Sequence, residues 1–347
     1  MTLPASRRER LRYDVLSLGL ADLGTMAGQV SCSLEGSIFD SIRTGGTLSW
    51  SGDDDLMPDW RHSLIRPMYV VQDQGEWPLG TLYCRAPRLV RKPGSISVSV
   101  QLFDRTLVTA ESRLTQPLAL PVGTPAVSTV VARLAALGET AVSVVPSSAT
   151  LAAALSWDAG TTETKVCNDI LSAVGYWSLH VDDWGIWQIA PYVLPAQRPI
   201  AFTFTPGQTA IHQADWSISR DDWQVPNRLT GIQRVDGDKT PLTSTQALPD
   251  SSPYSRRALG RWIDGEPLRN LEAANQTTLD AAVMRALLDK SDVASQVEIS
   301  HAWQPEIRLG SAVRFARAGA GRWAYNKTSM DLTPGLMVKA TLWEVHE

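Results

Sequence analysis

The sequence has few cysteines, and their spacing gives them no joint role. Cys32, Cys84 and Cys167 are the only three among 347 residues, and no CxxC pair occurs. An odd number of widely separated cysteines argues against a disulfide framework and against a zinc site. We therefore expect no metal and no cofactor, and a chain that folds in a reducing compartment.

Long apolar runs and an excess of positive charge are also missing. No run of about 18 apolar residues occurs, and the basic residues 1–15 lack the apolar stretch of a signal peptide, so we expect no membrane insertion. Lys and Arg number 32 against 36 Asp and Glu, which gives a net charge of -4. That balance argues against a protein that holds nucleic acid by charge, but it suits a wall past which DNA slides.

Common catalytic signatures are absent from the sequence. It contains no GxSxG, no P-loop and no GxGxxG motif, and none of its five histidines stands at HxxxH or HxH spacing. Two acid pairs, Asp182–Asp183 and Asp221–Asp222, each have a tryptophan nearby. Because glycosidases use two carboxylates across a sugar, a glycan site stays open beside the simpler interpretations, a hairpin turn and a solvated loop.

Asp53, Asp54 and Asp55 form the densest acidic cluster. A calcium loop needs carboxylates that alternate along a turn and a distant bidentate Glu, whereas these acids are adjacent and lack that Glu. The cluster favours a solvated loop over a calcium site.

Tryptophan is unusually frequent. The chain has 13 Trp against 7 Tyr and 5 Phe, and it is 44% hydrophobic and 20% charged, as expected of a globular protein long enough for two to four domains. Large aromatics of this kind serve sugar stacking, buried contact anchors or ordinary cores, and all three interpretations stay open.

Short strands are predicted at both ends of the chain. The clearest is residues 95–103, in which apolar residues alternate with polar ones, so that one face is buried and the other is wet. The other strand candidates are residues 12–18, 28–34, 47–50, 68–72, 79–84, 297–299, 312–315 and 337–343.

Helical spacing predicts three helices in the middle of the chain. One follows Thr124 as its N-cap and runs to Gly138, a second covers residues 162–174, and a third covers residues 277–290. A hairpin follows the second helix and turns at residues 182–185. Residues 241–257 are rich in Ser, Thr, Pro and Asp, which predicts a surface loop.

These patterns predict a mixed, mainly β fold: two β-barrel-like domains with inserted small α+β modules. We expect an N-terminal barrel-like domain over residues 1–110 and an α+β module over residues 111–200. Residues 201–292 would form a second barrel-like region with a loop and a helix, and residues 293–347 would supply the strands that complete it.

A series of motifs in a fixed order resembles minor tail proteins of phages that infect actinobacteria. These are similar to the tail-hub family, the central baseplate-hub trimers of contractile and flexible tails. The motifs are GGTLSW at 45–50, DWR at 59–61, LIRPMY at 64–69, EWPLG at 76–80, CNDIL at 167–171, VGY at 174–176, VDDWG at 181–185, VPNR at 225–228 and DLTPG at 331–335.

The resemblance implies a non-enzymatic structural subunit of the phage virion. Three copies would form a homotrimeric hub ring at the tail tip, around the channel used for DNA ejection, and would adapt the sixfold tail tube to a threefold tip. Its partners would be the distal tail protein, the tape measure protein and other tail-tip proteins, with DNA passing through without specific binding. It would reside in the host cytoplasm during assembly and in the virion afterwards.

Ring subunits that repeat about an axis meet through two different patches, which buried aromatics and arginines usually anchor. The interface candidates are Trp50, Trp60, Arg61, Arg66, Trp77, Trp223 and Trp262. A channel that does not trap phosphate should be acidic or neutral, which makes Asp53, Asp54 and Asp55 candidates for its wall.

Two other classes of protein remain as alternatives. One is a tail-associated hydrolase of cell-wall glycan, and the other is a carbohydrate-binding receptor module that stacks sugars on exposed tryptophans such as Trp184.

Overall fold

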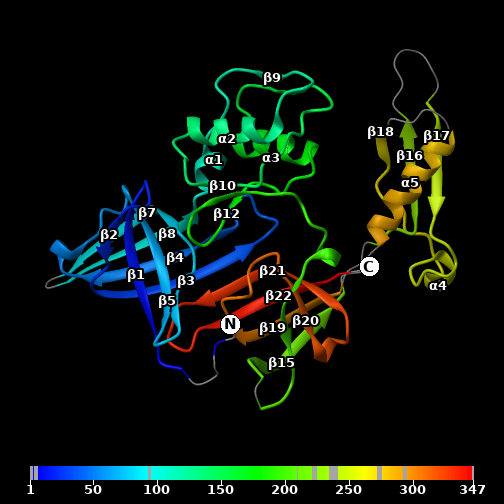
Figure 1. Ribbon diagram of the computed structural model, residues 1–347. Coiled ribbons are helices and arrows are strands. Elements are labelled where there is room, and N and C mark those ends of the chain that lie inside the picture. Colours follow the sequence, from blue (N-terminus) through cyan, green and yellow to red (C-terminus); the bar gives the residue numbers. More distant parts are fainter. Residues whose placement is uncertain are drawn as a thin grey trace. The chain divides into compact units, whose positions relative to one another are not determined.

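The computed structural model describes residues 3, 7–92, 95–208, 210–220, 225–233, 241–271, 276–291 and 295–345. The chain forms two compact units (Figure 1). Unit 1 comprises Met1–Ser217 and Glu298–Glu347, and unit 2 comprises Ile218–Val297. The fold is mixed and mainly β, as the sequence predicts. The predicted domain boundaries near residues 110, 200 and 292 stay predictions.

The described strands are short and follow one another closely along most of the chain. They are β1 (Glu9–Ser17), β2 (Asp22–Thr25), β3 (Gln29–Ser37), β4 (Thr44–Gly52), β5 (Ser63–Val71), β6 (Gly75–Pro78), β7 (Leu82–Lys92), β8 (Ser95–Asp104), β9 (Leu118–Leu120), β10 (Val142–Val144), β11 (Leu155–Trp157), β12 (His180–Val181), β13 (Trp187–Ile189), β14 (Ile200–Phe204), β15 (His212–Ser219), β16 (Arg228–Gln233), β17 (Thr243–Ala247), β18 (Leu268–Leu271), β19 (Gln296–Ala302), β20 (Ala312–Phe315), β21 (Arg322–Asp331) and β22 (Met337–Val345).

The described helices are fewer. The α-helices are α1 (Leu107–Glu111), α2 (Ala126–Ala136), α3 (Glu163–Ala173), α4 (Arg256–Leu259) and α5 (Gln276–Ser291), and the 3-10 helices are η1 (Asp54–Leu56), η2 (Pro195–Gln197) and η3 (Ala316–Ala318).

One large sheet joins strands from both ends of the chain. Its order is β15-β19-β22-β21-β3-β4-β8-β7-β5-β1-β2, with β6 on β5, β20 on β21 and β14 on β20. The antiparallel pairing of β21 with β3 brings Lys327 opposite Ser37 and Asp331 opposite Ser33. Among the described strands no pairing links β2 back to β15, so the sheet is an open path.

The buried face of β8 confirms the alternation read from the sequence. Ile96, Val98, Val100 and Leu102 are buried, while the serines between them are exposed. Each buried aliphatic side chain of this kind contributes about 1.5–3 kcal/mol relative to an exposed one. They join a core that also contains Trp50, and this core fixes which face of the sheet remains wet.

Pro67 and Pro78 both belong to strands, although the sequence suggested strands that begin after each of them. Pro67 stands in the middle of β5 and Pro78 ends β6. Proline fits in β5 because only its carbonyl is needed there, where it accepts the backbone N–H of Leu79 at 2.9 Å.

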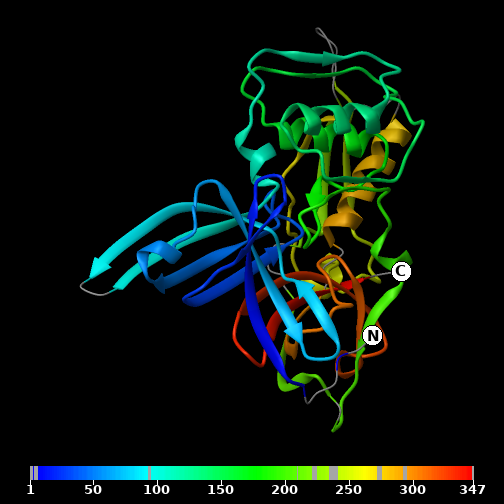
Figure 2. The same ribbon diagram turned by 60° about the vertical axis from the view of Figure 1, so that its left-hand side comes forward.

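The helical module between β8 and β14 has a core of its own. Helices α2 and α3 lie side by side (Figure 1) and bury Val130, Leu134 and Ile170. The prediction that Thr124 caps α2 is wrong, because Pro125 occupies the N-cap position and the Thr124 hydroxyl donates to the Pro121 carbonyl. In Figure 2 the β7–β8 hairpin, drawn in cyan, extends away from these helices.

The turn between β12 and β13 docks the module on the large sheet. Arg66 Nη2 donates to the Trp184 carbonyl at 2.8 Å, and Thr81 Oγ1 donates to the Asp183 carbonyl at 3.0 Å. Gly185 sits against the sheet so closely that a Cβ there would lie 2.9 Å from the Cβ of Thr81. The module is therefore held by specific backbone contacts and not by apolar packing alone.

Unit 2 is a small sheet covered by α5, which matches the predicted helix over residues 277–290. Strand β16 pairs antiparallel with β17 and parallel with β18. Gly231 lets the helix approach, since a Cβ there would lie 2.2 Å from Val283 Cγ2. The prediction of a surface loop over residues 241–257 is wrong for Thr243–Ala247. These polar residues form strand β17, whose backbone hydrogen-bonds to β16.

Candidate functional site

The wet face of β3, β4 and β8 is lined by small hydroxyl side chains. The register places Ser31 opposite Ser49 and Ser49 opposite Ser99. In the same way it pairs Ser33 with Thr47 and Ser51 with Ser97. We call this surface the hydroxyl face, and its members are Ser31, Ser33, Thr47, Ser49, Ser51, Ser97, Ser99 and Gln101. None of these side chains carries a charge.

The hydroxyl face exists because three strands alternate in the same phase. Leu48 and Trp50 of β4 are buried, so Thr47, Ser49 and Ser51 must point to the other side of the sheet. Across the strands, the Ser33 and Thr47 hydroxyls lie 3.0 Å apart and share a hydrogen bond. Polar side chains on this face thus need no partner beyond water and one another.

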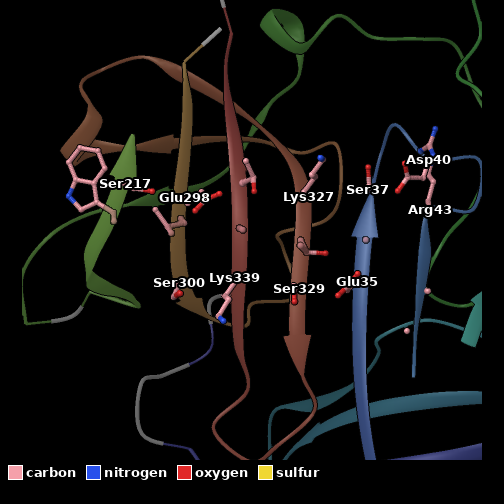
Figure 3. A pocket seen from close by; sticks show the side chains of 18 of the residues that line it. Glu35, Ser37, Asp40, Arg43, Ser217, Glu298, Ser300, Lys327, Ser329 and Lys339 are labelled. Atoms are coloured by element: carbon pink, nitrogen blue, oxygen red, sulfur yellow. The ribbon is translucent and has the colours of Figure 1, made fainter. Parts of the chain in front are cut away.

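A groove of about 900 Å³ continues this polar surface across β21, β22, β19 and β15 (Figure 3). Its floor includes Gly45 and Gly46 of the GGT motif. Gly46 is required there because a Cβ would lie 2.0 Å from the Ser33 carbonyl oxygen. The two glycines thus place no side chain in the groove where β3 and β4 meet.

Charges in the groove are nearly balanced. The groove is lined by four carboxylates and three cations, which gives it a net charge of -1. The acids are Glu35, Asp40, Asp215 and Glu298, and the bases are Arg43, Lys327 and Lys339. Figure 3 shows Lys327 and Lys339 on adjacent strands, with Glu35 on the strand beyond them.

Arg43 closes one end of the groove. Its Nη2 donates to the Ser178 carbonyl at 3.3 Å and its guanidinium lies over the Trp177 ring at 5.6 Å. Burial lowers the pKa of Arg43 to about 10, and the Asp104 carboxylate opposes this shift. Arg43 therefore stays a cation at neutral pH, held by the helical module.

Several predicted interface residues lie in or near the core of unit 1. Trp50 and Trp60 are buried and pack edge to face with ring centroids 6.2 Å apart. Trp77 is half-buried and lies 6.0 Å from the Trp303 ring. Arg66 lies over the Trp184 ring and holds the module.

The remaining candidates differ in exposure. Arg61 is exposed, Trp262 in unit 2 is 36% exposed, and Trp223 lies outside the described residues. Asp53, Asp54 and Asp55 are exposed directly after β4, where η1 begins. Arg91 donates to Asp54 at 2.9 Å.

The acid pair Asp182–Asp183 has structural partners. Asp182 accepts the backbone N–H of Ile186 at 2.9 Å with one oxygen and the Gln188 amide at 2.9 Å with the other. Asp183 forms an ion pair with Arg308 at 3.0 Å, and although burial raises the pKa of Asp183, this cation opposes the rise. Both carboxylates thus shape the turn and its docking. The pair Asp221–Asp222 lies outside the described residues.

Among the described residues no three His, Cys, Asp or Glu side chains gather where they would hold a metal ion. No described helix is both long and apolar enough to cross a membrane.

The sequence analysis missed the hydroxyl face and the groove. The signal for the face was present in the alternating serines of VSCS, LSWS and SISVSV, at residues 30–33, 48–51 and 95–100. The groove had no such signal, because it joins β3 to strands nearly 300 residues later.

No family model and no curated protein matches this sequence. Solved structures do match in fold. A tail protein from Neisseria meningitidis MC58 matches with a TM-score of 0.64 at 14% identity, over 96% of each chain. The 43 kDa tail protein of prophage MuSo2 from Shewanella oneidensis matches with a TM-score of 0.66 at 11% identity, over 95% of this chain and 98% of that one.

Prophage tail protein gp18 from Listeria monocytogenes EGD-e matches with a TM-score of 0.54 at 12% identity, over 96% of this chain and 94% of that one. The chain therefore has the fold of these phage tail proteins. The resemblance to tail proteins is confirmed at the level of the fold, and the narrower likeness to proteins of actinobacterial phages stays a prediction.

Proposed function

We propose that this chain is a structural subunit of a phage tail tip, in which three copies form a hub ring around the DNA channel. The observation that carries the proposal is the fold shared along nearly the whole chain, 95–96%, with three tail proteins. A ring of three would adapt a sixfold tube to a threefold tip. Each subunit then meets its neighbours through two different patches.

In this proposal the hydroxyl face lines the channel. Each Lys or Arg that engages a phosphate adds affinity by releasing counterions, so a wall of such residues would hold DNA back. The members of the hydroxyl face carry no cation, and the nearest arginines, Arg85 and Arg88 of β7, lie at its edge opposite Gln101 and Ser99. Asp53, Asp54 and Asp55 follow the end of β4, so they would lie at the rim of this wall.

The proposed role is non-enzymatic. The acid pair best placed for glycan chemistry, Asp182–Asp183, is occupied by hydrogen bonds and by the ion pair with Arg308. A glycosidase needs one free carboxylate as acid and another as base or nucleophile. Shape and buried contacts, not reactive side chains, would perform the task.

The proposed partners are a distal tail protein, a tape measure protein and other tail-tip proteins. The chain would be made in the host cytoplasm and would become part of the virion. This proposal includes interface roles for Arg61, Arg66, Trp77 and Trp262. The buried Trp50 and Trp60 would support the interface indirectly, by packing in the core beneath it.

Antibody labelling of purified virions tests the location. We expect gold particles at the tail end distal to the capsid, in particles that carry the chain in near-threefold stoichiometry by quantitative mass spectrometry. Clear zones on a cell-wall zymogram, given by the purified chain, would favour the glycan hydrolase instead. Absence of the chain from virions would overturn the proposal.

A further inference from the structure

Unit 2 carries an exposed patch in which arginines surround a tryptophan. Helix α4 begins after Ser255, whose hydroxyl accepts the backbone N–H of Ala258, and ends at Gly260, whose φ of 68° gives a sharp stop. The chain then turns back through Arg261 and Trp262. We call this surface the Arg–Trp patch, and its members are Arg256, Arg257, Leu259, Arg261 and Trp262.

The tryptophan of the patch is held in place. Two guanidinium groups lie over the Trp262 ring, those of Arg228 at 4.7 Å and Arg256 at 4.9 Å from its centroid. Arg228 is itself fixed by Asp264, with N–O distances of 2.5 and 2.9 Å. A preorganised aromatic loses little freedom on binding, which suits a contact anchor.

The other arginines of the patch have unused binding capacity. In the described part of the chain, no carboxylate forms an ion pair with Arg256, Arg257 or Arg261. All three are exposed, and Leu259 beside them is 39% exposed. Guanidinium groups pair best with carboxylates or phosphates, and Arg and Trp dominate the energetics of protein interfaces.

Unit 1 presents a surface of opposite charge. Residues 53–56, which we call the acidic loop, carry three aspartates followed by Leu56, which is 44% exposed. Asp54 has Arg91 as its partner, whereas no described cation forms an ion pair with Asp53 or Asp55. The acidic loop and the Arg–Trp patch are therefore complementary in charge, and each also exposes an apolar side chain for contact.

We propose that the acidic loop of one copy docks on the Arg–Trp patch of a second copy. The proposal rests on the ring proposed above, because a closed ring needs contacts between two different surfaces of the same chain. DNA is a poorer occupant for the patch, since the whole chain has a net charge of -4 and a subunit that grips phosphate would slow ejection.

Charge reversal in the full-length chain tests the contact. Arg257→Glu with Arg261→Glu, or Asp53→Arg with Asp55→Arg, should each weaken self-association at least roughly tenfold by mass photometry and sedimentation. Combining all four substitutions in one chain restores opposite charges and should restore assembly. Reversal of Arg314 and Lys339, two exposed bases of unit 1 outside the acidic loop, is the matched control and should leave assembly unchanged.

A cysteine pair supplies a second measurement. The native cysteines are buried, so Asp55→Cys with Arg261→Cys adds the only exposed thiols among the described residues. Oxidation should link separate chains on a non-reducing gel. Links confined within one chain would overturn the proposal.

The outcomes separate this proposal from the ring itself. If the wild-type chain forms a ring that the charge reversals leave intact, the docking is wrong and the ring stands. If the ring persists and only binding to duplex DNA is lost on Arg257→Glu with Arg261→Glu, the patch belongs to nucleic acid and the docking is again wrong. If no ring forms in solution or in virions, both proposals fail.

Discussion

Glu139 shows how one residue joins two parts of unit 1. It pairs with Arg105 at the end of the large sheet and accepts the indole N–H of Trp187 at 2.7 Å. Arg105 and Glu139 are only 3% and 5% exposed. A buried pair of this kind adds little over an apolar replacement, but loss of one partner leaves a buried charge without compensation.

We therefore predict that Glu139→Gln destabilises the protein by about 3–5 kcal/mol, measured by urea unfolding. Lys165→Ala removes an exposed ion pair with Asp169, in which Lys165 is 61% exposed, and should cost at most about 1 kcal/mol. Equal losses in the two variants would contradict this account of the buried pair.

The burial of His301 leads us to predict that the stability of the protein depends on pH. Its imidazole is buried, with one nitrogen at 2.8 Å from the Tyr325 hydroxyl and the other at 2.9 Å from the Ala302 carbonyl. Burial lowers the pKa of His301 to about 4, although the Ala302 carbonyl opposes the shift. In the unfolded chain this histidine has a pKa of about 6.5 and takes up the proton first, so stability falls as the pH drops from about 6.5 to about 4.

His301→Gln should reduce that slope, since glutamine does not titrate. The measurement is the urea midpoint at pH 7 and at pH 4.5, in wild type and variant. His62→Gln is the control, because the His62 side chain is 73% exposed. The same slope in wild type and His301→Gln would refute the assignment.

At the scale of the element, periodicity predicted most strands and helices. The strands β8 and β20 and the helices α3 and α5 follow the pattern of their apolar residues closely. Thr243–Ala247 was not predictable as a strand, because its composition is polar and its pairing with β16 comes from tertiary structure. The docking of the β12–β13 turn was invisible for the same reason: Arg66 and Thr81 lie about 100 residues before it.

The site was partly predictable on the same grounds. Alternation alone put the serines of β8 on a wet face, but the neighbours of that face depend on register. The pairing of β3 with β21 joins residues almost 300 positions apart and creates the groove. The interface roles expected of Arg61, Arg66 and the tryptophans stay predictions.

A substitution at Gly185 tests how the β12–β13 turn docks on the large sheet. Gly185→Ala places a Cβ 2.9 Å from Thr81 Cβ, at a φ of 78° that already disfavours a side chain. Gly160→Ala, at a φ of 89° with open space around it, is the matched control for backbone strain alone. We expect the control to lose about 1–2 kcal/mol and Gly185→Ala to lose clearly more by urea unfolding. Equal losses would mean that the close approach is unimportant.

At the scale of the whole molecule, the proposed function of the hydroxyl face is to line the channel through which DNA passes. Changing Ser31, Ser49 and Ser99 to Lys adds three cations per subunit to the proposed wall, and DNA should leave the capsid more slowly and in a more salt-dependent way. Ser143→Lys, Ser156→Lys and Ser172→Lys, on exposed positions of the helical module, form the control. DNA release at the wild-type rate from virions with the changed face would place the channel elsewhere.

The central claim is that closed assembly about a threefold axis, and not chemistry, is what this chain contributes. Electron microscopy of the tail end of purified virions, averaged without imposed symmetry, tests it most directly. We expect a ring of three copies around an open channel, with the hydroxyl face turned inward. A single copy at the tail end, or a ring whose channel is lined by Lys and Arg, would contradict the account.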